Sequence, residues 1–78
     1  MNKKALVEAS LFVSDKPLSL QRLAGIIGSS IDDTKKIITE IQLQLKNDDR
    51  GIDLTETPEG FEFRIKPEYR DNVARLAP

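Results

Sequence analysis

The stretch Ser19–Leu45, SLQRLAGIIGSSIDDTKKIITEIQLQL, decides the fold, because it predicts two helices joined by a tight turn. Apolar residues within 20–27 follow the i, i+3, i+4, i+7 spacing of one helix face, and Ser19 is a suitable N-cap. Gly28 fits the left-handed position that often ends a helix, and either of the two following serines can cap the next one. Two helices joined by such a short glycine-containing turn are typical of a helix-turn-helix.

The second helix of this pair has an inner apolar stripe and an outer polar face. Its first turn holds Asp32 and Asp33, where the helix dipole favours negative charge. Leu43 lies on the outer face, where a single exposed leucine needs no explanation, although contact with a partner is the alternative. The predicted inner stripe consists of Ile31, Thr34, Ile38, Ile41 and Leu45.

A helix over about Lys3–Ser14 precedes the pair and is apolar on two sides. Val7 and Leu11, four residues apart, form one stripe. Helices that are apolar on most sides are usually buried, so one interpretation places both stripes in the core. The alternative is that Val7 and Leu11 contact another chain. The other stripe consists of Ala5, Leu6, Ala9, Phe12 and Val13.

Two strands and a last helix follow the helix pair. Residues 52–55 and 61–66 alternate between apolar and polar, and Pro58–Gly60 supplies the turn, so a hairpin with one apolar face is expected. The hairpin must dock on the helices, since an isolated one is marginally stable. Pro67 suits the first turn of a closing helix. Its apolar stripe consists of Tyr69, Val73 and Leu76.

The fold class predicted by this order is α+β, a winged helix with a three-helix helix-turn-helix core, a β-hairpin wing and a C-terminal helix. The 78 residues suffice for one domain, covering 1–78. The chain has no cysteine and no histidine, so a disulfide scaffold is excluded and the commonest general base and metal ligand are missing. No membrane span or catalytic motif is evident, and we expect no enzyme activity, no metal and no cofactor.

The charge distribution argues against direct reading of DNA. The chain has 12 Lys and Arg against 13 Asp and Glu, a net charge of −1. The recognition helix would present Asp32 and Asp33 to the phosphates, where DNA-binding proteins place basic residues. Lys35 and Lys36 are its only adjacent basic pair and weak nucleic-acid candidates, with a solvated surface as the alternative. The sequence therefore favours a protein-interaction module, whose candidate contacts are Val7, Leu11 and Leu43.

Several segments resemble segregation and condensation protein B, a partner of chromosome-condensing SMC complexes. Residues 5–14, ALVEASLFVS, followed by 17–20, PLSL, resemble the opening of that family. Residues 60–69, GFEFRIKPEY, resemble its wing and the start of its next helix, and Arg50–Ile52 resembles the start of the first wing strand. Ser10 departs from the larger apolar residue usual there, and the turn at 15–16 departs from a Gly-Glu type.

The resemblance implies a non-enzymatic adaptor of the SMC complex in chromosome condensation and segregation. Its expected partners are a second copy in a homodimer and the kleisin subunit, segregation and condensation protein A, which connects it to SMC. Contact with DNA would be indirect or weak, and the expected location is cytoplasmic and nucleoid-associated, without a membrane. Family members carry two winged-helix domains, so this chain is expected to be the first part of a longer protein. The alternative is a DNA-binding winged-helix transcription regulator.

Overall fold

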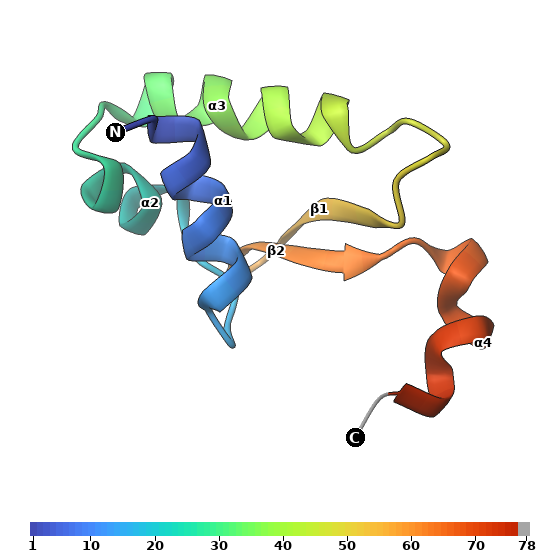
Figure 1. The fold of residues 1–78 in the computed structure, drawn as a ribbon. Coiled ribbons are helices and arrows are strands. Elements are labelled where there is room, and N and C mark those ends of the chain that lie inside the picture. The colour runs from blue at the N-terminus through green and yellow to red at the C-terminus, as the bar shows by residue number, and fades with distance from the viewer. Residues whose placement is uncertain (77–78) are drawn as a thin grey trace.

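The computed structural model describes residues 1–76 and packs three helices against a two-stranded antiparallel sheet (Figure 1). The helices and strands are α1 (Lys3–Val13), α2 (Leu20–Ile27), α3 (Ile31–Gln44), β1 (Ile52–Thr57) and β2 (Gly60–Ile65). Three short helical pieces follow, namely η1 (Pro67–Tyr69), α4 (Arg70–Val73) and η2 (Ala74–Leu76). The order of these elements is that of the predicted α+β winged helix.

The helix-turn-helix forms with the capping groups that its sequence predicts. The side chain of Ser19 accepts a hydrogen bond from the Arg22 amide at 3.0 Å, and that of Ser30 accepts one from the Asp33 amide at 3.1 Å. Gly28 adopts φ 65°, the left-handed region in which a side chain is unfavourable. These local signals fix the turn, so α2 and α3 present their apolar stripes to the same core.

The core lies where α1, α2 and α3 meet the hairpin. It contains Val7, Leu11, Leu23, Ile27, Ile38, Ile41, Leu45, Leu54 and Phe61. Most of the predicted stripe of α3 is buried as expected, but Ile31 at its first turn is 40% exposed. Leu23 and Val7 are fully buried, which places α1 as well as α2 in the centre of the domain.

The structure corrects the predicted orientation of α1. Its narrow stripe, Val7 and Leu11, enters the core, whereas Phe12 and Val13 of the wider stripe are 83% and 81% exposed. Because both stripes are apolar, the helix alone does not determine which one is buried. Contacts with α2, α3 and β2 determine which stripe is buried. Val7 and Leu11 lie one turn apart on the same side of the helix, so both side chains enter the core.

The sheet contains a short third segment that the sequence pattern did not predict. Leu18, just before α2, pairs with Phe61 of β2 through two backbone hydrogen bonds of 2.9 and 2.8 Å. In the hairpin itself, Leu54 lies opposite Phe63 and Thr57 lies opposite Gly60. One edge of β2 is therefore covered at Phe61, while within residues 1–76 β1 has β2 as its single neighbouring strand.

The last segment differs from the predicted closing helix. None of the residues in η1, α4 and η2 is buried, and Leu76 is 83% exposed. Figure 1 shows this segment extending away from the helical core beyond the end of the hairpin. Three apolar residues offer too little area to hold a helix this short on the core. Its tie to the domain includes the Tyr69 hydroxyl, which donates to the Asp48 carbonyl at 3.3 Å.

Candidate functional site

Within residues 1–76, no helix is both long enough and apolar enough to span a bilayer. In the same part of the chain, no three His, Cys, Asp or Glu side chains are grouped so as to hold a metal ion. The adjacent carboxylates Asp32 and Asp33 are exposed in the first turn of α3 and so provide no sheltered acid–base pair. The surface of residues 1–76 has several hollows, and two of them involve the exposed apolar side chains of α1 and α3.

The first hollow is a mostly apolar groove of about 320 Å³ between α1 and the open end of the hairpin. Its lining comprises Ala5, Glu8, Ala9, Phe12, Leu45, Arg50, Ile52 and Phe63. Ala5 and Ala9 are small, so the helix surface is low there, while Phe12 rises one turn further on. Ile52 and Phe63 are only half-buried, because they lie beyond the part of the sheet that the helices cover. We refer to this hollow as the α1 groove.

The α1 groove has one acidic and one basic residue in its lining. Glu8 comes from α1 and Arg50 from the loop before β1, and both are exposed. The ion pairs found among residues 1–76 are Lys4–Glu40, at 3.3 Å, and Glu62–Arg64. Glu8 and Arg50 are therefore free, within the described part of the chain, to pair with charges on another molecule.

The structure places two of the three residues predicted to meet a partner in the core of the domain. Val7 and Leu11 are 0% and 5% exposed, so they hold α1 on the core and offer almost no surface to another chain. The exposed apolar surface of α1 is instead the opposite face, which carries Phe12 and Val13. The helical spacing groups these residues into one stripe, and the expectation that Phe12 and Val13 lie in the core is wrong.

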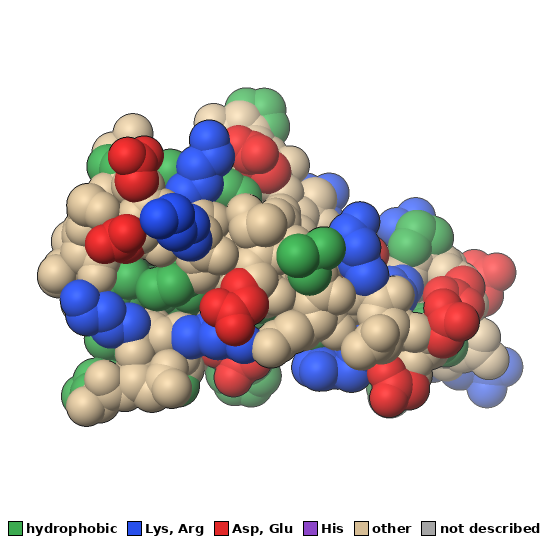
Figure 2. Space-filling view, turned by 90° about the horizontal axis from the view of Figure 1, so that it is seen from above, with side chains coloured by type: hydrophobic (Ala, Val, Ile, Leu, Met, Phe, Trp, Pro, Cys, Tyr) green, Lys and Arg blue, Asp and Glu red, His purple; other side chains and the backbone are tan. Residues whose placement is uncertain are grey.

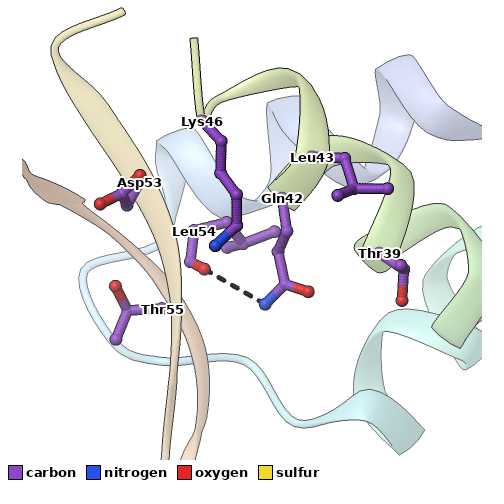
Figure 3. Close-up of a pocket in the computed structure, with 7 residues that line it drawn as sticks. All are labelled: Thr39, Gln42, Leu43, Lys46, Asp53, Leu54 and Thr55. Carbon is purple, nitrogen blue, oxygen red and sulfur yellow. Dashed lines mark hydrogen bonds between the residues drawn. The ribbon is translucent and has the colours of Figure 1, made fainter. Parts of the chain in front are cut away.

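The second hollow, of about 350 Å³, lies between α3 and the free edge of β1 (Figure 3). We refer to it as the α3–β1 hollow; it is lined by Thr39, Gln42, Leu43, Lys46, Asp53, Leu54 and Thr55. Leu43 is 63% exposed on its helical wall, as its outward position predicted. Gln42 spans part of the gap, donating from Nε2 to the Leu54 carbonyl at 3.3 Å. The contact role of Leu43 stays a prediction.

Basic residues do not form a continuous surface on the α3 side. Lys35 and Lys36 are exposed as expected, but Lys35 lines a hollow together with Glu56 and Glu59 of the wing. Figure 2, which views the molecule from above α3, shows basic and acidic side chains interspersed over this face. Such a surface lacks the concentrated positive charge with which proteins bind the DNA backbone.

A family model described as segregation and condensation complex subunit ScpB matches residues 5–78 of this chain. The chain belongs to the ScpB family. It is 34% identical over 76 residues to segregation and condensation protein B of Carboxydothermus hydrogenoformans, covering 97% of this chain and 41% of that protein. It is 30% identical to the homolog in Coxiella burnetii, covering 97% of this chain and 37% of that protein. The chain thus spans about two fifths of the length of these ScpB relatives.

Solved ScpB structures have the same fold. A crystal structure of a dimer of the ScpB N-terminal domain complexed with a ScpA peptide superimposes with a TM-score of 0.89 at 37% identity, covering 96% of this chain and 87% of that chain. ScpB from Mycobacterium tuberculosis gives 0.88 at 27% identity, covering 95% of this chain and 46% of that one. The predicted resemblance and the predicted winged-helix fold class are both confirmed.

Proposed function

We propose that this domain is a non-enzymatic adaptor of the SMC complex in chromosome condensation and segregation. It forms a homodimer, binds ScpA and reaches SMC through it, at the nucleoid in the cytoplasm, and contacts DNA only indirectly or weakly. The observation that carries the proposal is the α1 groove, with Phe12 and Val13 more than 80% exposed on the same helix. The similar ScpB N-terminal domain that crystallised as a dimer with a ScpA peptide supports it.

The apolar area of Phe12, in the α1 groove, and of Val13, beside it on α1, is large enough to contribute substantially to self-association. Burying one large apolar side chain stabilises by roughly 1.5–3 kcal/mol. A two-fold interface uses each patch twice, so Phe12 and Val13 together contribute roughly 6–12 kcal/mol. Association costs about 4–15 kcal/mol in lost freedom, so these two residues offset much of that cost and the rest of the groove must also be covered.

The α1 groove is also self-complementary in shape and charge, as a two-fold interface requires. It contains both a projecting side chain, Phe12, and a recess beside Ala5 and Ala9 that a second Phe12 can enter. Its lining offers both Glu8 and Arg50, so one protomer's acid can face the other's base. Opposite charges arranged in this way fix the register of two patches more than they add affinity.

We expect this chain to have a solution mass of twice 8.8 kDa at micromolar concentration, and to bind ScpA of the same organism. Sedimentation equilibrium measures the first property, and isothermal titration with purified ScpA measures the second. A monomer at all accessible concentrations contradicts the self-association, and a dimer that gives no heat with ScpA contradicts the partner. The two halves of the proposal are thus tested separately.

We expect weak binding to a duplex of random sequence and no preference among sequences. Asp32 and Asp33 at the start of α3 and Glu59 at the wing tip repel phosphates, so few counterions are released on contact. Fluorescence anisotropy at about 50 and 200 mM salt checks this, since six to ten phosphate contacts would weaken binding by about 10³–10⁵ between these concentrations. Tight, steeply salt-dependent binding would favour the DNA-binding regulator instead.

A further inference from the structure

The hydrogen-bonding groups of β1 face outward at every second residue. Phe61 exchanges both of its backbone hydrogen bonds with Leu18, on the side of β2 away from β1. Since such pairs alternate along an antiparallel ladder, Glu56 opposite Phe61 points its own amide and carbonyl away from β2. The same alternation applies to Leu54 and Ile52. The Lys66 amide, which donates to the Gly51 carbonyl at 2.9 Å, lies in the matching register.

This outward edge of β1 is open along the α3–β1 hollow. Among residues 1–76, the protein group bonded to it is the side chain of Gln42, which donates to the Leu54 carbonyl at 3.3 Å. β1 is six residues long and pairs with β2 without a bulge. β1 contains no proline and no bulge, which are two of the devices with which proteins protect a free edge.

We propose that an extended peptide segment of a partner chain adds to the free edge of β1 as a further strand, in the α3–β1 hollow. Backbone hydrogen bonds to the outward amides and carbonyls of Ile52, Leu54 and Glu56 would hold the segment. One backbone amide of the segment would replace the Gln42 side chain at the Leu54 carbonyl. The inference rests on the proposed function in naming ScpA as the chain that supplies this segment.

The walls of the hollow specify the chemistry of the segment. Figure 3 shows Leu54 directed toward α3, with Asp53 and Thr55 on the other side of β1. Side chains of an added strand alternate in the same way. One set meets Leu43 and Lys46 of α3 and the other lies beside Asp53. A segment that fits therefore has apolar or acidic residues on the side that meets α3, and neutral or basic residues on the side that lies beside Asp53.

Glu56→Pro tests the strand addition, and Glu56→Ala is its matched control. Proline removes the outward amide but leaves the pairing with β2 intact, so the fold tolerates it at this edge. Alanine removes the same side chain and keeps the amide. In titrations with ScpA of the same organism, we expect Glu56→Pro to weaken binding about tenfold, the value of one backbone hydrogen bond, and Glu56→Ala to change it less than twofold.

Amide hydrogen exchange followed by NMR gives a second, independent measurement on the unmodified chain. Adding ScpA should slow exchange at Ile52, Leu54 and Glu56, and leave the amides of Asp53 and Thr55, already bonded to β2, unchanged. Equal protection along β1, or no protection, overturns the inference even if ScpA binds. If ScpA does not bind the unmodified chain, the proposed partner is wrong and the inference fails with it. If Glu56→Pro unfolds, as circular dichroism would reveal, the exchange pattern decides.

Discussion

Leu11→Asp is expected to unfold the domain, whereas Phe12→Asp is expected to leave it folded and monomeric. The two residues are neighbours on α1, but Leu11 is 5% exposed in the core and Phe12 is 83% exposed at the α1 groove. Aspartate at position 11 loses the burial of a leucine and places an unpaired carboxylate among apolar side chains. The combined cost of about 5 kcal/mol or more equals the whole stability of a small domain.

At position 12 the same aspartate faces water in the monomer, so its effect on folding should stay within about 0.5 kcal/mol. In the dimer it removes a central aromatic contact from each protomer. At about 2 kcal/mol per site, the loss of two such contacts raises the dissociation constant about 10³-fold. Thermal unfolding by circular dichroism and sedimentation equilibrium measure the two effects on the same samples.

Leu43→Asp is the matched control for this pair of variants, because Leu43 is 63% exposed but lies in the α3–β1 hollow. It should remain folded and dimeric. A dimeric Phe12→Asp would show that the α1 groove is not the self-association surface. A folded Leu11→Asp would show instead that the packing of α1 on the core is wrong, since an unpaired carboxylate is strongly destabilising at a buried apolar position.

The helix-turn-helix was predictable because its signals are local. Each capping residue acts within a few residues of its own position: Ser19 and Ser30 accept hydrogen bonds from amides in the first turns of α2 and α3, and Gly28 ends α2. The apolar spacing of α2 has no interruption. The hairpin was equally readable from its alternation and from the turn at Pro58–Gly60. In these segments, propensity, capping and periodicity all agree, which is the condition under which a pattern specifies a structure.

The orientation of α1 and the position of the last segment depend on contacts between distant residues. On α1 two apolar stripes compete, and only the shapes of α2, α3 and β2 decide that Val7 and Leu11 are buried. At the end of the chain, Tyr69, Val73 and Leu76 have helical spacing but no large surface to cover, so the expected closing helix becomes short pieces. Periodicity identifies apolar faces, but does not say whether a neighbour covers them.

The candidate surfaces were less predictable than the fold for the same reason. The α1 groove combines residues from α1, the end of α3, the loop before β1, and both strands, which are far apart in sequence. Leu43 was correctly placed on the outside, since one apolar residue on a polar helix face is a local signal. Which groups of β1 face outward follows from the pairing of Leu18 with Phe61, and a single bridging residue leaves no periodic pattern in the sequence.

Gly60→Ala is expected to destabilise the domain by about 3–5 kcal/mol, because it disrupts the pairing of Leu18 with Phe61. Gly60 has φ 143°, a conformation that residues with a side chain rarely adopt. A Cβ there would overlap the Leu18 carbonyl and lie 2.6 Å from the Ser19 nitrogen. Relief requires Leu18 to move away from β2, which breaks two backbone hydrogen bonds worth about 1 kcal/mol each and adds about 1–3 kcal/mol of backbone strain.

Gly25→Ala is the control that separates this overlap from a general effect of adding a methyl group. Gly25 lies within α2 and is exposed, and a Cβ at this position would lie more than 4 Å from any atom beyond its chain neighbours and the adjacent backbone of α2. Alanine is the better helix former by about 1 kcal/mol, so Gly25→Ala should raise the free energy of unfolding in urea while Gly60→Ala lowers it. If Gly60→Ala were neutral, Leu18 would not be held against β2, and the docking of the wing would depend on its other contacts, which include the buried Phe61 and Leu54 side chains.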